Sequence, residues 1–470
     1  MDRSTARLDD LQRAIDGEVI VPGSPGFDRL PRPFNARFDD EVPQTVVLCR
    51  SAGDVAETIS FIRRHGHASA TRSGGHCFAG RSSTPGIVID VTPMRSVSVS
   101  GGVATVGAGA DLGEVYLGMI DHDLTIPGGT CPSVGIPGLT LGGGLGMLGR
   151  KHGVTSDHLL GARIVLADGR IIECDDHHDE ELFWALRGAG TGHFGVVSDL
   201  VFRPIPAPAM TIFHLTWSFS HAAAVAQAWQ GWAPTAPDEA AASLVMAASG
   251  DPDEEPSVEM FGAVLGNRTD AAELLGEVVA RTNSDPDATH VEELSYRDAL
   301  RHWAERAGER LEAPREHASP RSYRVIRSGF FARPLPSDVI AVVLDHLVEG
   351  RKAGGSRELD FSPWGGAYNR TPADATAFVH RDPAFSVKHA VGLDPDASTA
   401  ERAAAHGWVT ESWSSVRRWG TGCVFPNFPD PDLEDWGRAY YGSNYERLLD
   451  VKARYDPDNL FRFRQSLPVR

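Results

Sequence analysis

The chain has 470 residues, and at roughly 150 residues per domain this length indicates two to four packed units. Hydrophobic residues make up 41% and charged residues 23% of the sequence, a composition that excludes both a disordered chain and a fibre. The 45 Lys and Arg against 63 Asp and Glu give a net charge of −18, which argues against duplex nucleic acid as a partner, because such binding requires a cationic face.

Residues 1–205 alternate short strands with few helices. The segment from 45 to 72 predicts a strand–helix–strand unit, because Ser51 can cap a helix that runs towards Gly66 between two apolar runs. Gly101 and Gly102 indicate a tight hairpin between two alternating runs. The strands predicted here span 45–49, 68–72, 86–91, 96–100, 103–107 and 196–202, with a hairpin at 163–174 and helices at 9–16 and from 182.

Residues 203–208 are rich in proline and resemble a linker, and the composition changes beyond them. The region from about 209 to 415 alternates Ala-rich helices with strands, which is typical of one antiparallel sheet backed by helices. We expect helices at 221–233, 271–281 and 337–350, strands at 211–217, 257–265, 323–331 and 357–362, and a last helix at 445–453. The predicted domains are therefore 1–205, with a split near 100, then 206–415, and a C-terminal segment from 416 to 470.

Targeting and cysteine usage give further expectations. No run approaches the roughly 20 apolar residues that span a bilayer, and residues 1–10 lack the apolar core of a signal peptide. We therefore expect a cytoplasmic protein with no membrane partner. The five cysteines are too few and too scattered for a disulfide framework, and without a CxxC pair or other ligand pattern we expect no metal site.

Glycine is concentrated in one region. Residues 101–153 hold 16 of the 49 glycines, so backbone there must pass close to a ligand or to another part of the chain. Gly144–Gly149 satisfies GxGxxG, but a Rossmann fingerprint must follow a buried strand and open a helix. Here a Pro-Gly loop precedes the motif, and Asp168, the acidic residue at the right spacing, lies at a predicted hairpin tip. We reject a Rossmann site and leave open a phosphate ligand held by loop amides.

Two other Gly-rich loops each place one nucleophilic side chain after a predicted strand. The loop 72–80 carries His76, and the loop 127–135 carries Cys131. From the residues alone, a hydrogen-bonded loop histidine and a small buried thiol explain these positions as well as a functional role does.

With these loops the sequence resembles the berberine bridge enzyme-like flavoproteins, within the larger vanillyl-alcohol-oxidase-type, or PCMH-type, FAD-binding superfamily. The middle region is only loosely similar, as expected where the substrate is recognised. The resemblance implies an α+β fold, with a PCMH-type FAD-binding domain of two α+β subdomains and a substrate domain built on an antiparallel sheet. The matching segments are 73–76, 129–132 through 142–144, 150–153, 182–195, 440–448, 455–459 and 465–466.

The resemblance also implies how FAD is held. In family members with a doubly attached flavin, the matching His and Cys bond to the benzenoid end of the flavin, and this sequence has both, as His76 and Cys131. Loop amides would cradle the pyrophosphate. The implied cofactor-binding residues are His76, Cys131, Arg72, Ser73, Gly74, Gly75, Gly129, Ser133, Gly138, Gly142, Gly143, Gly144, Gly146, His152, Gly195, Val197, Tyr440 and Asn444.

The activity implied is that of an FAD-dependent oxidase. It would remove a hydride from a hydroxyl-bearing or similarly activated carbon of a sugar, a glycosylated metabolite or an aromatic biosynthetic intermediate, and reduce dioxygen to hydrogen peroxide. Val134 occupies the position, three after the linking Cys, where plant oxidases carry Val and dehydrogenases carry Leu. Two departures are Phe78, where many members have Tyr, and the sequence after Gly365–Gly366, which lacks the Glu of the alkaloid-cyclising members.

A hydroxyl substrate needs a base to accept its proton as hydride leaves. Tyr440 matches the family's active-site tyrosine, and Glu358, Asp360 and Tyr368 are further candidates. Glu358 and Asp360 fall on one face of a predicted strand, but surface carboxylates on an edge strand are an equally good account of them. Two other functions stay open: a flavoprotein that confers resistance by binding or reoxidising a toxic metabolite, and a dehydrogenase that passes electrons to a quinone or a protein.

Overall fold

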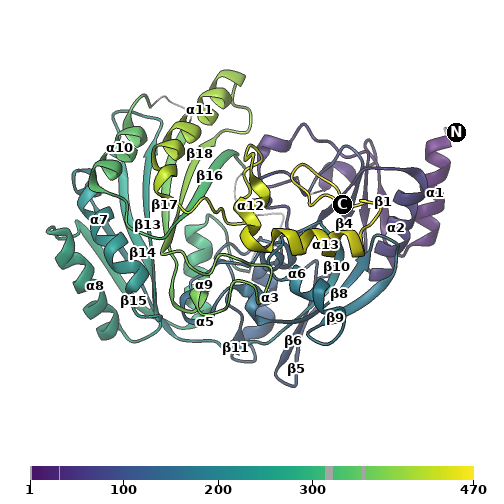
Figure 1. Ribbon diagram of the computed structural model, residues 1–470, viewed down its shortest axis with the longest axis horizontal. Coiled ribbons are helices and arrows are strands. Elements are labelled where there is room, and N and C mark those ends of the chain that lie inside the picture. Colours follow the sequence, from purple (N-terminus) through teal and green to yellow (C-terminus); the bar gives the residue numbers. More distant parts are fainter. Residues whose placement is uncertain (1–2, 31, 313–320, 352–354) are drawn as a thin grey trace.

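Three main sheets, reached in order along the chain, organise the protein (Figure 1). The structure is a computed structural model that describes residues 3–30, 32–312, 321–351 and 355–470. Two of the sheets lie in the N-terminal half, and the third, with seven strands, lies in the C-terminal half. This arrangement confirms the predicted α+β class.

The first sheet contains the predicted strand–helix–strand unit. Its strands are β1 (Glu18–Ile20), β2 (Thr45–Leu48), β3 (Ser69–Arg72) and β4 (Ile87–Asp90), in the order β1-β2-β4-β3. Both β2 and β3 pair with β4 in parallel, so β4 lies between the two strands of the unit. Helix α2 (Ala52–His65) is capped as predicted, because the hydroxyl of Ser51 accepts a hydrogen bond from Asp54 N at 3.1 Å. Helix α1 spans Arg3–Ala14, so it begins and ends earlier than predicted.

The second sheet is antiparallel and five-stranded. Its strands are β5 (Val97–Ser100), β6 (Val103–Gly107), β8 (Leu159–Leu166), β9 (Ile171–Asp175) and β10 (Gly195–Phe202), in the order β5-β6-β10-β8-β9. Asp168 lies in the turn between β8 and β9, and the GxGxxG motif lies between the short helices α4 (Ile136–Leu141) and α5 (Gly149–His152). Because the motif follows no buried strand, the rejection of a Rossmann site is confirmed. Helices α3 (Leu112–Ile120) and α6 (Glu180–Leu186) complete this part.

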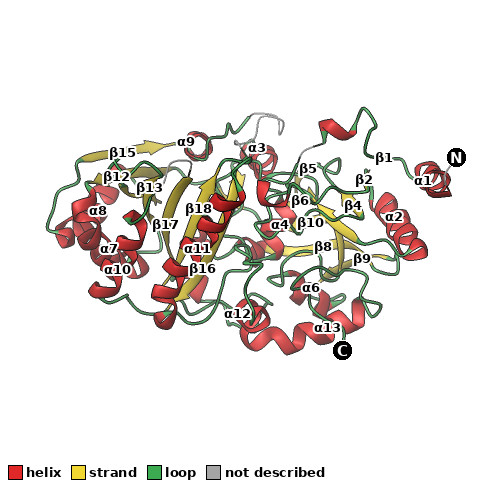
Figure 2. Ribbon diagram, turned by 90° about the horizontal axis from the view of Figure 1, so that it is seen from above, coloured by secondary structure: helices red, strands yellow, loops and turns green. Residues whose placement is uncertain are grey.

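The third sheet is the predicted antiparallel sheet backed by helices. Its order is β15-β12-β14-β13-β17-β18-β16, with helices α7, α8, α10 and α11 on its outer face (Figures 1 and 2). The strands are β12 (Met210–Trp217), β13 (Ala240–Ser249), β14 (Ser257–Val264), β15 (Ala288–Leu294), β16 (Tyr323–Phe331), β17 (Gly355–Pro363) and β18 (Phe385–Leu393). The helices are α7 (Ala222–Trp232), α8 (Arg268–Thr282), α9 (Tyr296–Arg306), α10 (Ser337–Val348) and α11 (Thr399–Val416).

Several elements were not predicted. Strand β13 is rich in alanine, which favours helices, and Val245 is its only β-branched residue. Strand β15 lies at the edge of the sheet and is mostly exposed, so its sequence shows no apolar alternation. Strand β18 and helices α9 and α11 were also missed. The predicted linker contains a two-residue strand, β11 (Ile205–Pro206), that pairs with β7 (Leu124–Thr125).

The C-terminal segment returns to the N-terminal part of the molecule, where helices α12 (Trp436–Tyr441) and α13 (Tyr445–Tyr455) pack into its core (Figure 1). Lys452 is fully buried and donates to Asp456 and to the backbone oxygens of His193, at 2.8 Å, and Phe461, at 2.7 Å. Its three donors are therefore all satisfied. No helix among the described residues has the length and apolar character needed to cross a membrane.

Replacing Asp456 with Asn should destabilise the protein, because it leaves the buried ammonium of Lys452 without its counter-charge. We expect the free energy of unfolding to fall by about 3 kcal/mol, the scale for breaking a buried ion pair. Denaturant unfolding measures the change. Asp450→Asn, on the exposed side of the same helix, is the matched control and should stay within about 0.5 kcal/mol. Equal stability of the two variants would contradict this assignment.

Candidate active site

The loops that carry His76 and Cys131 lie against each other. A Cβ atom on Gly74 would lie 2.2 Å from the backbone nitrogen of Gly135, so the two backbones approach more closely than any side chain allows. A hydrogen bond joins the loops, since Oγ of Ser133 is 2.9 Å from Nε2 of His76. The structure thus brings the two predicted attachment residues to one place.

A buried carboxylate that the sequence did not single out lies at this junction. Glu309 accepts hydrogen bonds from the backbone nitrogen of Ser133 at 2.9 Å and from its hydroxyl at 2.8 Å. Burial raises the pKa of the Cys131 thiol, and the charge of Glu309 raises it further. Glu309 could not have been found from its sequence neighbourhood, because it follows a helix that was not predicted.

The surroundings of helix α4 fit a polar ligand. The hydroxyls of Thr140 and Ser156 are buried and have no hydrogen-bond partner within the described part of the chain. Gly138 faces open space, since a Cβ atom there would meet no heavy atom within 4 Å. Buried hydroxyls are normally hydrogen-bonded, so these residues suit a cofactor rich in hydroxyl and phosphate groups, as FAD is.

The glycines that follow α4 pack tightly against other parts of the protein. A Cβ atom on any of them would collide with protein: Gly142 with Asn427, Gly143 with Phe378, Gly144 with Thr155 and Gly146 with the backbone of Gly128. The N–H of Gly143 donates to Thr140 O at 3.0 Å, and that of Gly146 donates to the hydroxyl of Tyr368 at 3.5 Å. These two amides therefore have protein partners, and the contact of the four glycines with FAD stays a prediction.

Several other predicted cofactor residues also hold protein segments together. Arg72 donates to Ser82 O at 3.0 Å, Ser73 to Ala108 O at 2.8 Å and Asn444 to Ala373 O at 2.7 Å. The backbone oxygen of Gly75 accepts from Phe34 N, that of Gly129 accepts from the Tyr116 hydroxyl, and that of His152 accepts from His158. Gly195 and Val197 lie in β10. Their roles towards FAD stay predictions.

A charged cluster lies on the face of the third sheet that is turned away from its helices. Lys388 of β18 contacts Asp360 at 2.8 Å and Glu358 at 3.2 Å, both on β17. Burial alone would lower the pKa of Lys388, but the two carboxylates raise it above its ordinary value. Strand β17 is central, between β13 and β18, so these carboxylates do not lie on an edge strand.

An aromatic contact connects this cluster to the His76 loop. The ammonium of Lys388 lies 5.5 Å from the ring centre of Phe428, and Phe428 packs edge-to-face on Phe78 at 6.0 Å. Phe78 is two residues after His76, so the carboxylates of β17 and the attachment loops border the same region. Lys388 also lowers the pKa of Cys131 from across this region, less than burial raises it.

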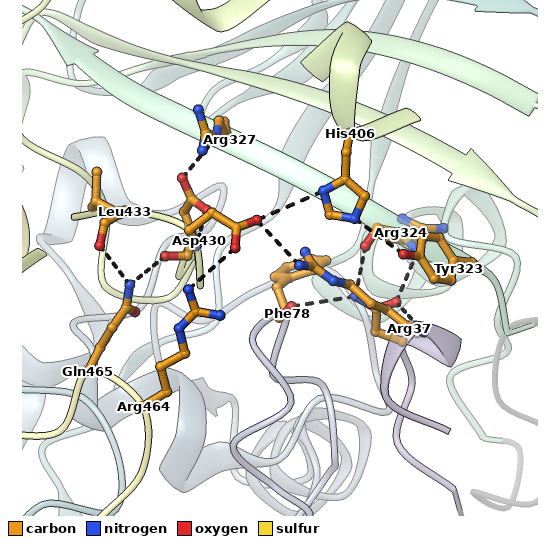
Figure 3. A network of polar contacts seen from close by, with 12 residues as sticks. Arg37, Phe78, Tyr323, Arg324, Arg327, His406, Asp430, Leu433, Arg464 and Gln465 are labelled. Carbon is orange, nitrogen blue, oxygen red and sulfur yellow. Dashed lines mark hydrogen bonds and ion pairs between the residues drawn. The ribbon is translucent and has the colours of Figure 1, made fainter. Parts of the chain in front are cut away.

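Tyr440 is buried and contacts Asp430. Asp430 belongs to a polar network that joins the two halves of the molecule (Figure 3). The hydroxyl of Tyr440 accepts from Asp430 N at 2.8 Å, and Asp430 pairs with Arg327 of β16 at 3.0 Å. The guanidinium of Arg81 lies 6.0 Å from the centre of the Tyr440 ring. Burial raises the pKa of Tyr440 to about 12, although the positive charge of Arg81 acts to lower it. The phenol is therefore protonated at neutral pH.

The structure does not bring Tyr368 to the charged cluster. Its ring stacks on Trp364 at 4.5 Å, and its hydroxyl donates to Gly146 O at 3.1 Å. Burial also raises the pKa of Tyr368 well above its ordinary value. We therefore assign Tyr368 to packing beneath the glycine-rich loop, which corrects the prediction that it is a base.

Val134 is half-buried against the core, in the loop that carries Cys131.

Family models match both ends of the chain, and relatives match it along nearly its whole length. The family model described as "FAD binding domain" matches residues 43–175, and the one described as "Berberine and berberine like" matches residues 424–468. The FAD-linked oxidoreductase YvdP of Bacillus subtilis is 32% identical over 97% of this chain and 98% of its own. Aclacinomycin-N/aclacinomycin-A oxidase of Streptomyces galilaeus is 30% identical over 94% and 88%.

Solved structures share the architecture. Berberine bridge enzyme from Eschscholzia californica matches with a TM-score of 0.90 at 24% identity, covering 99% of each chain. Chitooligosaccharide oxidase matches with a TM-score of 0.86 at 25% identity, covering 99% of this chain and 100% of the other. These likenesses confirm the PCMH-type fold, and the FAD-binding family model supports FAD as the cofactor.

Proposed function

Because the chain belongs to the berberine bridge enzyme-like family of FAD-linked oxidoreductases, we propose that it is an oxidase whose FAD is bonded to both His76 and Cys131. Its substrate is an alcohol or an activated C–H of a sugar or of a secondary-metabolite intermediate. The relatives named as oxidases of aclacinomycin, tetrahydroberberine and chitooligosaccharide support these substrate classes. The observation that carries the proposal is the junction of the His76 and Cys131 loops.

When bound beside His76 and Cys131, FAD would supply a two-electron acceptor for the substrate's hydride, with dioxygen as the proposed final acceptor. The chain itself provides the proton acceptor and a dry site. The rings of Phe78 and Phe428 pack against each other between the attachment loops and β17 and would help to exclude water once FAD and substrate are bound, which would strengthen the charge interactions there. Lys388 holds Asp360 and Glu358 in place, and Tyr440 is the candidate that accepts the proton of a substrate hydroxyl.

Covalent attachment at two points predicts a specific pattern in the variants. His76→Ala and Cys131→Ala should each keep flavin in acid-precipitated protein, because the other residue still forms its bond. The double variant should lose all acid-stable flavin. Absorbance of the precipitate and mass spectrometry of its peptides measure this outcome. Acid-stable flavin in the double variant would show that attachment occurs elsewhere.

A substrate screen under air with peroxide detection tests the function. We expect turnover of a sugar or of an aromatic or glycosylated metabolite, with one hydrogen peroxide formed for each substrate oxidised. Binding of a metabolite without turnover would replace the proposal with the resistance function. Turnover with a dye but without oxygen consumption would replace it with a dehydrogenase.

A further inference from the structure

A chain of polar groups, buried at Glu309 and half-buried at Ser133 and His76, leads from the end of helix α9 to His76. The helix ends at Arg306, and Gly308, with φ of +72°, turns the backbone in the left-handed region. Glu309 follows at 5% exposure, and Leu311, two residues on, packs in the core of the N-terminal part. This segment therefore holds the carboxylate of Glu309 firmly against the Cys131 loop.

The hydrogen bonds of Ser133 determine where His76 carries its proton. A serine hydroxyl has one proton to donate, and Ser133 gives it to Oε1 of Glu309 at 2.8 Å while its backbone N–H binds Oε2 at 2.9 Å. The hydroxyl oxygen can then only accept from Nε2 of His76, 2.9 Å away. Neutral His76 therefore has its proton on Nε2 and a lone pair on Nδ1.

A second contact fixes the ring plane. Phe34 stacks on the imidazole of His76 with ring centres 4.5 Å apart and an interplanar angle of 15°. The backbone N–H of Phe34 donates to the oxygen of Gly75 at 3.0 Å, which anchors the stacking residue to the same loop. Stacking and the bond at Nε2 together define both the plane of the imidazole and its rotation within that plane.

We propose that Glu309, acting through the hydroxyl of Ser133, is the positioning residue that makes Nδ1 of His76 the atom that bonds to the flavin. The proposal rests on the covalent attachment proposed above. In this step a C–H bond of the flavin's benzenoid methyl group breaks, and the carbon bonds to Nδ1. The electron pair and two protons, one from the methyl group and one from the imidazole, remain on the reduced flavin, and dioxygen reoxidises it to give hydrogen peroxide.

Glu309 should speed bonding of the flavin to His76 but slow its bonding to Cys131. Cys131 must lose its proton to be nucleophilic, and after burial the charge of Glu309 is the largest cause that raises the pKa of its thiol. Removing this charge should slow bonding to His76 and leave bonding to Cys131 as fast or faster. General damage to the loops would slow both.

The experiment follows flavin attachment at one residue at a time. Full-length protein produced under riboflavin starvation is mixed with FAD, and acid-stable flavin is measured over time in a Cys131→Ala background, where only His76 can react. We expect Ser133→Ala and Glu309→Gln to slow attachment at least tenfold, and Ser133→Thr, which keeps the hydroxyl, to stay within threefold. Glu312→Gln is the matched control, because Glu312 is exposed and pairs with Arg301 at 2.7 Å. The affinity for FAD before attachment, measured in the same samples, separates slower bond formation from weaker FAD binding.

The same Glu309→Gln change in a His76→Ala background tests the opposite effect on the rate of flavin attachment at Cys131. Attachment there should be no slower than with Glu309 present. Attachment to His76 at an undiminished rate in Ser133→Ala would overturn the positioning role while leaving the proposed function intact. Slower attachment at both residues would overturn the positioning role of Glu309 and show that Glu309 only supports the structure of the loops. Absence of a flavin–His76 peptide from the wild type would overturn both the positioning role and the covalent attachment on which it rests.

Discussion

Replacing Tyr440 with Phe is expected to lower the rate of flavin reduction by substrate about 10²-fold, the scale for losing general-base help. The change removes only the hydroxyl, which accepts from Asp430 N at 2.8 Å, so the fold and FAD binding should survive. Anaerobic stopped-flow mixing with substrate measures the rate directly. Tyr441→Phe is the matched control: its hydroxyl donates to Ala189 O at 2.8 Å, and its loss should change the rate no more than a few-fold.

The pH profile separates the candidate bases. Burial raises the pKa of Tyr440 to about 12, so the ionised fraction of the phenol rises tenfold with each pH unit below that value. If Tyr440 accepts the proton, the reduction rate of the wild type should rise from pH 7 to pH 10, and Tyr440→Phe should abolish the rise. A flat profile with an unchanged rate in Tyr440→Phe would contradict this role and assign it to a carboxylate of β17, tested with Asp360→Asn and Glu358→Gln.

The sequence was a good guide to the N-terminal fold because the signals there are local. Ser51 and Asp54 cap a helix, and Gly101 and Gly102 form a hairpin, so each element is determined by residues next to it. In the third sheet, β13 pairs on one side with β14, the next strand in the sequence, but on the other side with the distant β17. Strand β18 likewise lies between β16 and β17, which precede it with other elements in between. Such pairing overrides the helix preference of an alanine-rich run.

In the candidate site, too, the residues with a local sequence signal could be predicted and those that act across the chain could not. His76 and Cys131 could be named because they stand in loops with a recognisable sequence, and Glu358 with Asp360 because strand alternation places them on one face. Lys388 and Glu309 could not be named, because each acts on residues far away in the chain. Close contacts with Asn427, Phe378 and Thr155 require glycine at 142–144, and the sequence alone does not distinguish such a protein neighbour from a ligand.

Val134→Leu is expected to slow reoxidation of the reduced flavin by dioxygen at least tenfold. Two hydrogen bonds fix the turn that carries Val134. The N–H of Val134 donates to Cys131 O at 3.3 Å, and the backbone oxygen of Val134 accepts from Leu112 N at 3.0 Å. Pro132 and Pro137 stiffen the same loop. An added methylene therefore has to fill space beside the flavin rather than displace the loop, since close-packed interiors have little slack.

The control for this change is a smaller side chain. Val134→Ala should reoxidise at least as fast as the wild type, and anaerobic reduction by substrate should be nearly unchanged in both variants. Reoxidation of Val134→Leu at the wild-type rate would show that oxygen reaches the flavin by another route.

The central claim is that dioxygen is the electron acceptor of this protein. The most direct test needs no substrate: the wild-type protein is reduced anaerobically with dithionite and mixed in a stopped-flow instrument with oxygenated buffer, while flavin absorbance and hydrogen peroxide are followed. The account predicts complete reoxidation within seconds, with one hydrogen peroxide per flavin. Reduced flavin that persists for minutes in air would contradict the claim and identify the protein as a dehydrogenase.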